Sequence, residues 1–316
     1  MSAHPSSWIE VPQDSRFPLH RLPLGTRRRP DGSHAVCTRV GDRVADLRVL
    51  AEVGVYEDTG AAKADFAEAN LNALLAHGRD VLARVRARTI ACLDDDPNYW
   101  DFRQRAEIFL LPAESVRLIL PIAAGDYTRF ARSDESTWAH REARAGNLLV
   151  EGDVDWAAAS ADDRLRGRTV TREWRPMIGI GLVVAGGDED AFPYGLCGLA
   201  DWTTGAAAEV DELRAGRRTV LAPWVTPLAA FDDGDVPVEA VLSAGERDTR
   251  GRVLLRERVR PQCDELLAAL LAEGAVVRAG DLLARSVGQP ETPDDRWIVK
   301  DVAALSVDTW TNPPAG

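Results

Sequence analysis

The stretch MIGIGLVVA, residues 177–185, decides the fold class of this chain. It is an almost continuous apolar run rich in isoleucine and valine, and Gly186-Gly187 ends it. β-Branched residues favour strands, and a strand that is apolar on both faces lies inside a sheet that is covered on both sides. We therefore expect a buried central strand here, at the core of a β-rich protein.

The region before residue 110 predicts a small β module followed by helices. Residues 35–40 and 43–47 flank Gly41-Asp42, a short connection that suits a tight hairpin. Between residues 64 and 92, apolar residues recur mainly at intervals of three and four, which is helical spacing, and Gly78 indicates a break between two helices.

The region after the central strand adds further strands and one helix. Residues 238–243 and 252–259 predict a second hairpin around a polar turn. Residues 262–273 predict an amphipathic helix that Gly274 ends, and residues 278–284 predict a turn that leads into a strand.

Composition and charge exclude several classes of protein. The chain has 316 residues, 45% of them hydrophobic, which is enough for a large core. A net charge of −12 repels phosphate backbones and anionic lipid surfaces, so we expect no nucleic-acid or membrane partner. The four cysteines form no CxxC or zinc spacing. The N-terminus lacks a secretory signal pattern, so we expect a cytoplasmic protein, and the heavy use of alanine and arginine suggests a bacterial source.

Seven short motifs occur in an order that resembles the fumarylacetoacetase family over nearly the whole chain. They are Phe17–Gly25, Gly41–Leu47, Leu120-Pro121, Gly125–Thr128, Asp201-Trp202, Pro223–Pro227 and Gly280–Ala284. The resemblance implies an α+β, β-rich architecture: an N-terminal β-barrel-like module with following helices, residues 1–110, and a mixed β-roll with the ligand pocket, residues 111–316. It also implies a homodimer.

The resemblance further implies where the family's chemical groups fall, and most of them are replaced. The first metal carboxylate aligns with Arg129, a substrate-contacting aromatic residue with Ala131, and the catalytic histidine with a position near Ser136. The Glu-x-Glu metal ligands align with residues 178–180, and only Asp201 keeps a carboxylate. Mg²⁺ and Ca²⁺ need several oxygen ligands, so we expect a site without metal or other cofactor.

Arg129 and Asp201 are expected to form an ion pair in which the guanidinium stands in for the divalent cation. A fixed arginine can hold a planar carboxylate or enolate through two hydrogen bonds. The alternative is that the pair only closes a vacated hole. Tyr127, Ser136 and Trp202 are the further residues that we expect to bind the substrate.

His140 is the candidate general base. Residues 133–140 predict the start of a helix, in which His140 lies one turn beyond Ser136 and shares its face. An imidazole there would exchange protons near neutral pH. The alternative is a surface histidine paired with Glu135 or Glu142.

Two functions follow from these expectations. The first is a metal-independent enzyme of specialised metabolism that acts on a small anionic oxo-acid or a β-dicarbonyl compound by decarboxylation, tautomerisation, C–C cleavage or cyclisation. Arg129 would steady an enolate, and His140 or Asp201 would move a proton. The second is a non-catalytic homologue, either a binding protein or the inactive partner of an active paralogue. A metal-dependent hydrolase with shifted ligands is a third class.

Overall fold

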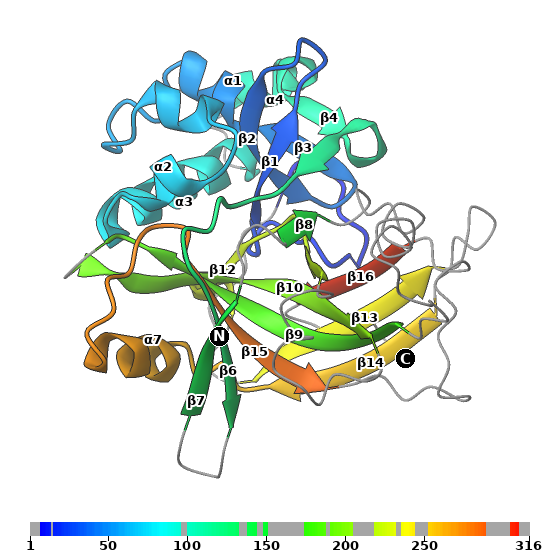
Figure 1. Ribbon diagram of the computed structural model, residues 1–316. Helices are drawn as coiled ribbons and strands as arrows, with labels where there is room; N and C mark the ends of the chain where they lie inside the picture. The colour runs from blue at the N-terminus through cyan, green and yellow to red at the C-terminus, as the bar shows by residue number, and fades with distance from the viewer. Residues whose placement is uncertain are drawn as a thin grey trace.

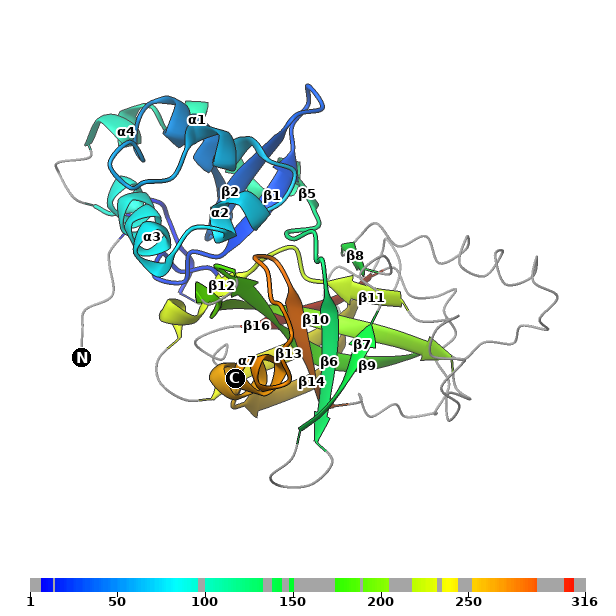
Figure 2. The same cartoon turned by 60° about the vertical axis from the view of Figure 1, so that its left-hand side comes forward.

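The computed structural model describes residues 7–13, 15–95, 100–132, 138–143, 148–150, 174–187, 190–204, 218–231, 235–243, 252–288 and 304–309. Figure 1 shows short helices and a small sheet in the N-terminal part, above the long strands that make up the rest. Figure 2 shows the same stacking from another side. None of the helices in the described ranges has the length and apolar character that a membrane crossing requires.

The N-terminal sheet has five strands, all paired antiparallel, in the order β4-β3-β2-β1-β5. The strands are β1 (Leu24–Arg28), β2 (His34–Val40), β3 (Arg43–Asp46), β4 (Leu110–Pro112) and β5 (Arg117–Ile119). The hairpin of β2 and β3 confirms the expected turn, in which Gly41 has a φ of 56°. Because β4 and β5 complete this sheet beyond residue 110, we propose that the domain boundary lies near Pro121.

Short helices pack on this sheet. They are α1 (Leu47–Glu52), η1 (Lys63–Ala67), α2 (Asn72–Leu75), α3 (Arg79–Leu93), α4 (Trp100–Gln104), η3 (Ala106–Ile108) and η4 (Ala113–Ser115). Gly78 is the N-cap of α3, which confirms the predicted break. The stretch before Gly78 is a 3₁₀ turn and one short helix, and Leu71, Leu74 and Leu75 are buried in the core.

The second part is built on an eight-stranded mixed sheet, whose main path is β7-β6-β15-β9-β10-β11-β8. Its strands are β6 (Tyr127–Arg132), β7 (Trp138–Ala143), β8 (Leu148–Val150), β9 (Trp174–Ala185), β10 (Phe192–Thr204), β11 (Arg218–Leu221), β12 (Thr226–Pro227) and β15 (Leu282–Gly288). β15 runs parallel to β6 and β8 runs parallel to β11, whereas the other pairs are antiparallel. The expected mixed β architecture is therefore confirmed.

A three-stranded sheet and a helix cover the mixed sheet. The sheet has the order β14-β13-β16, and its strands are β13 (Val236–Ser243), β14 (Arg252–Val259) and β16 (Ala304–Thr309). The β13–β14 hairpin was predicted, and its turn lies outside the described residues. The helix is α7 (Cys263–Ala272), and a short 3₁₀ turn, η7 (Leu228–Ala230), follows β12. Gly274 has a φ of 81° just after α7, as expected of a helix-ending glycine.

The central strand β9 is buried on both faces, as the sequence predicted. On one face, Val183 and Ala185 join a core cluster that also contains Leu74 and Leu75 of the N-terminal part. On the other face, Leu182 and Val184 pack with leucines of α7. The sheet is thus held between the two covering layers, and the side chains on its central strands have fixed positions.

Two of the sequence motifs meet at the joint between the parts. Leu24 of β1 and Val225 exchange two backbone hydrogen bonds of 2.8 Å each. A Cβ atom at Gly25 would lie 2.8 Å from the backbone oxygen of Pro223 and 2.8 Å from the ring of Trp224. Glycine is therefore required at position 25 for the two segments to approach this closely.

We predict that Gly25→Ala lowers the free energy of unfolding by about 1–3 kcal/mol, because the added methyl group collides with backbone atoms that cannot move independently. Urea denaturation followed by far-UV circular dichroism measures the change. Gly187→Ala is the matched control, since the nearest atom to its added Cβ lies 4.0 Å away. Equal, small effects of the two substitutions would contradict the close approach at the joint.

Candidate functional site

Arg129 on β6 and Asp201 on β10 form an ion pair on one face of the mixed sheet. Nη2 of Arg129 lies 2.6 Å from Oδ2 of Asp201, and the side chains are 16% and 1% exposed. Strands β15 and β9 lie between the two strands that carry the pair. The contact therefore connects strands that are not neighbours, and it confirms the ion pair predicted from the sequence.

The second oxygen of the Asp201 carboxylate accepts a hydrogen bond. The hydroxyl of Thr219 on β11, directly opposite in the β10–β11 register, donates to Oδ1. Thr219 is itself buried. A buried charge is tolerated when it is paired and hydrogen-bonded, and both conditions hold for Asp201. The carboxylate is thereby fixed as the charge partner of Arg129.

Met177 and Ser286 complete the group. Met177 on β9 lies opposite Asp201 in the β9–β10 register. Its sulfur accepts from the Ser286 hydroxyl on β15 at 2.9 Å and from Nη2 of Arg129 at 3.5 Å. Met177 and Ser286 are both half-buried. We call Arg129, Asp201, Thr219, Met177 and Ser286 the arginine cluster.

The alternation of side chains along β9 shows which face residues 178 and 180 occupy, the positions aligned with the missing metal ligands. Met177 faces the arginine cluster, and successive side chains of a strand point to opposite faces. Ile178 and Ile180, both buried, therefore lie on the face of Leu182 and Val184, away from Asp201. The positions with which the Glu-x-Glu pair was aligned therefore do not face Asp201, and a shift of one residue along β9 would reverse the face.

Gly179 is the second β9 position on the side of the cluster. A Cβ atom there would lie 2.7 Å from the backbone oxygen of Arg285 and 2.9 Å from Cδ1 of Leu199. The side chain of Leu199 thus fills the place beside Gly179, and a carboxylate at position 179 would require the backbone of β15 to move.

These residues do not fit a hard divalent cation. Mg²⁺ and Ca²⁺ bind through several oxygen ligands. The groups beside Asp201 are the guanidinium of Arg129, the thioether of Met177 and the hydroxyl of Thr219, and Asp201 itself is paired with Arg129. Among the residues that the structure describes, no three His, Cys, Asp or Glu side chains gather as a metal site would require.

His140 is not on a helix. It lies in β7, where the register places it opposite Phe130 of β6 and places Arg141 opposite Arg129. Since neighbouring positions alternate between faces, His140 occupies the face opposite that of Arg129. The predicted helix was wrong because pairing with β6, a non-local interaction, outweighs the local capping pattern. The register therefore pairs position 140 with Phe130 and not with Arg129.

The other expected site residues have different placements. Tyr127 is 3% exposed and packs in the core cluster with Val183 and Leu282. Trp202 follows Asp201 on β10, at a position on the alternate face. Ser136 lies outside the described residues. Sequence reasoning missed Met177, Thr219 and Ser286, which only the strand registers bring together.

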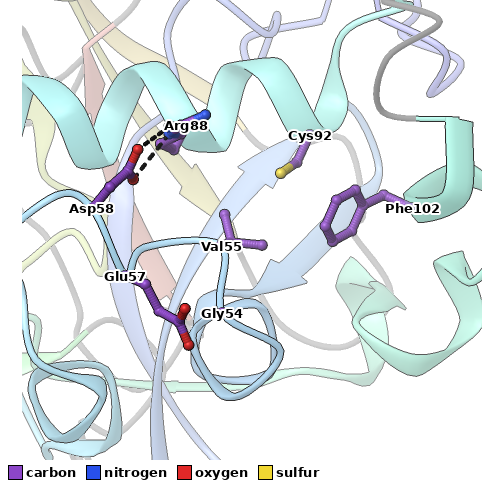
Figure 3. Close-up of a pocket in the computed structure, with 7 residues that line it drawn as sticks. All are labelled: Gly54, Val55, Glu57, Asp58, Arg88, Cys92 and Phe102. Atoms are coloured by element: carbon purple, nitrogen blue, oxygen red, sulfur yellow. Dashed lines mark hydrogen bonds and ion pairs between the residues drawn. The ribbon is translucent and has the colours of Figure 1, made fainter.

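Cavities also occur away from the arginine cluster. One of about 350 Å³ lies in the N-terminal part between α3 and the loop at Gly54, where Arg88 and Asp58 form an ion pair (Figure 3). The Cys92 thiol lines this cavity, and burial raises its pKa to about 12, so it is not a nucleophile at neutral pH. Another cavity, of about 470 Å³, lies between the start of β6 and the end of α7.

Asp281 fixes the backbone at the start of β6. The residue is 2% exposed. Oδ1 accepts from the backbone N–H of Asp126 at 2.9 Å, and Oδ2 accepts from that of Arg278 at 2.7 Å. Two motifs of the sequence, Gly125–Thr128 and Gly280–Ala284, are thereby joined, and the parallel pairing of β6 with β15 follows from their junction.

We predict that Arg129→Ala lowers the free energy of unfolding by about 3–5 kcal/mol, because it leaves the buried Asp201 charge without its partner. Arg129→Ala combined with Asp201→Ala should cost less than the sum of the two single changes. Urea denaturation measures all three. Arg88→Ala, which breaks the exposed pair with Asp58, is the control and should have little effect. An Arg129→Ala protein as stable as the wild type would contradict the account.

Comparison with known proteins gives matches of two kinds. Residues 20–121 match the family model for the fumarylacetoacetase N-terminal domain. The fumarylacetoacetase of Dictyostelium discoideum is 32% identical over 132 residues, which is 41% of this chain and 31% of that protein. That of Arabidopsis thaliana is 31% identical over 130 residues, 40% of this chain and 31% of that protein. The matches thus span about a third of the length of these relatives.

The solved structures extend the likeness to nearly the whole chain. A maleylpyruvate hydrolase from Sphingobium sp. SYK-6 has a TM-score of 0.55 at 13% identity, covering 91% of this chain and 95% of that one. A fumarylacetoacetate hydrolase from Exiguobacterium antarcticum has a TM-score of 0.55 at 14% identity, covering 91% and 94%. At such identities the likeness shows the fold alone. The N-terminal part of this chain thus matches the fumarylacetoacetase N-terminal domain in sequence, and the chain as a whole shares the fold of these solved hydrolases.

Proposed function

We propose that this protein is an enzyme of the fumarylacetoacetase superfamily that works without a metal on a small oxo-acid or β-dicarbonyl compound. The observation that carries the proposal is the ion pair of Arg129 with the buried Asp201. It holds a permanent cation on the face of the sheet where the family resemblance puts a metal.

Arg129 would bind the carboxylate or enolate oxygen of such a substrate. A guanidinium has five N–H donors on three nitrogens, and the contact with Asp201 engages one of them, Nη2, so N–H groups remain for a ligand both on Nη2 and on the other nitrogens. A cation held in place by a second charge stabilises an enolate at little reorganisation cost, which is how preorganised sites lower a barrier. The reaction types that pass through an enolate are tautomerisation, decarboxylation, C–C cleavage and cyclisation.

The names of the structural neighbours agree with this substrate class. The maleylpyruvate hydrolase is named for a small oxo-acid. Specialised metabolism and a homodimeric assembly are parts of the same proposal, and they rest on the family resemblance.

The alternative is a non-catalytic homologue, a binding protein or the inactive partner of an active paralogue. Among the described residues, Asp201 is the one group of the arginine cluster that accepts protons, and its oxygens are already engaged, Oδ2 by the ion pair with Arg129 and Oδ1 by the hydroxyl of Thr219. This observation favours binding over turnover. The two functions differ in one property: an enzyme forms the enolate, whereas a binding protein does not.

We predict that the purified protein, in the presence of EDTA, catalyses exchange of the α-protons of oxaloacetate or acetylacetone with deuterium, as followed by ¹H NMR. Arg129→Ala should weaken the binding of oxaloacetate by about tenfold or more, because a hydrogen bond to a charged group is lost. Arg88→Ala, which removes a cation of the N-terminal part, should leave both binding and exchange unchanged.

The outcomes separate the alternatives. Binding without exchange supports the non-catalytic homologue. Exchange that appears only after Mg²⁺ or Mn²⁺ is added would contradict the metal-independent proposal and support a hydrolase with shifted ligands.

A further inference from the structure

Two strong donors converge on a weak acceptor in the arginine cluster. The Ser286 hydroxyl lies 2.9 Å from the sulfur of Met177, and Nη2 of Arg129 lies 3.5 Å from the same atom. A hydroxyl and a guanidinium are strong donors, whereas a thioether sulfur accepts only weakly. An oxygen, above all a charged one, satisfies both donors far better. The Met177 sulfur thus occupies a place that suits a ligand oxygen.

The strands hold the two donors at a set separation. Arg129 on β6 lies opposite Ala284 of β15, and Ser286 is two residues further along the same strand. Residues two apart on a strand share a face, so Arg129 and Ser286 are diagonal neighbours on β6 and β15. Both strands lie inside the sheet, with partners on either side. The donor pair is therefore part of the rigid scaffold.

Met177 is the part of this arrangement that can move. Methionine is unbranched and has three rotatable side-chain bonds, so its end can adopt several positions at low cost. The side chain is half-buried, in contrast to the fully buried residues that follow it on β9. It is therefore able to turn aside without unpacking the core.

We propose that Arg129 and Ser286 together bind one oxyanion of the substrate, a carboxylate or enolate oxygen, and that Met177 occupies this subsite in the ligand-free protein and is displaced by the ligand. The inference rests on the proposed function, and it adds a second substrate-binding residue and a residue that limits the size of the bound group. Asp201 keeps its place throughout, since its contact with Arg129 orients the guanidinium.

The contribution of Ser286 is measured by isothermal titration calorimetry with oxaloacetate and with pyruvate, in EDTA. Ser286→Ala should weaken binding by about tenfold or more, because a hydroxyl donor to a charged oxygen is lost. Ser286→Thr, which keeps the hydroxyl, should bind nearly as well as the wild type. Ser115→Ala is the matched control, because it removes a serine hydroxyl from the exposed surface of the N-terminal part.

The role of Met177 is measured by removing its side chain. Met177→Ala vacates the place between the two donors, so this variant should bind pyruvate more tightly than the wild type, and Ser286→Ala in the same background should abolish the gain. Since the chain has only two methionines, ¹³C-methyl methionine NMR reports Met177 directly. Its resonance should shift on saturation with oxaloacetate, and that of Met1 should not.

The results distinguish failure of this inference from failure of the proposed function. If oxaloacetate binds and Arg129→Ala weakens it, but Ser286→Ala and the Met177 resonance show no effect, the subsite is wrong and the proposed function stands. If neither the wild type nor Met177→Ala binds any of the carboxylates, both the subsite and the proposed function are wrong.

Discussion

The ion pair between Arg129 and Asp201 is the constraint on which the rest of the candidate site depends. Asp201 is almost fully buried, and a lone charge in such a place is costly. The guanidinium of Arg129 and the hydroxyl of Thr219 balance it, one at each carboxylate oxygen. Once Asp201 is paired in this way, Arg129 has a fixed position, and Met177 and Ser286 lie within reach of it. A guanidinium differs from a divalent ion because it carries a single charge and acts through directed N–H donors. It suits the recognition and stabilisation of a planar anion, and it has no coordination site at which to bind a water molecule.

The fold supplies the rigidity that such a site requires. The strands that carry Arg129, Ser286, Met177 and Asp201 follow one another across the mixed sheet, which lies between α7 on one face and the N-terminal part on the other. Two contacts stabilise this arrangement: the close approach of Gly25 to the Trp224 segment, and the hydrogen bond that the Asp281 carboxylate accepts at the start of β6. Side chains on central strands of a covered sheet have little freedom, so donor positions in the site are set by strand pairing.

Local patterns in the sequence were sufficient to predict much of the fold. The hairpin at Gly41, the buried strand at residues 177–185 and the helix ended by Gly274 each depend on the spacing of apolar residues and on a glycine at a turn. The ion pair of Arg129 with Asp201 was also predictable, because both residues lie in or next to motifs that resemble those of the family. The face of His140 and the β9 positions beside Asp201 were not, because they depend on strand registers. Met177 and Ser286 are 109 residues apart in the sequence, and no local pattern places them in contact.

Native mass spectrometry of the full chain in the presence of Mg²⁺, Mn²⁺ or Ca²⁺ tests whether Arg129 takes the place of a divalent ion. We expect a protomer mass without a stoichiometric metal for the wild type, whichever ion is supplied. One divalent ion per protomer, lost on substitution of Asp201 by asparagine, would contradict the account, because the carboxylate would then be a metal ligand and not the partner of Arg129.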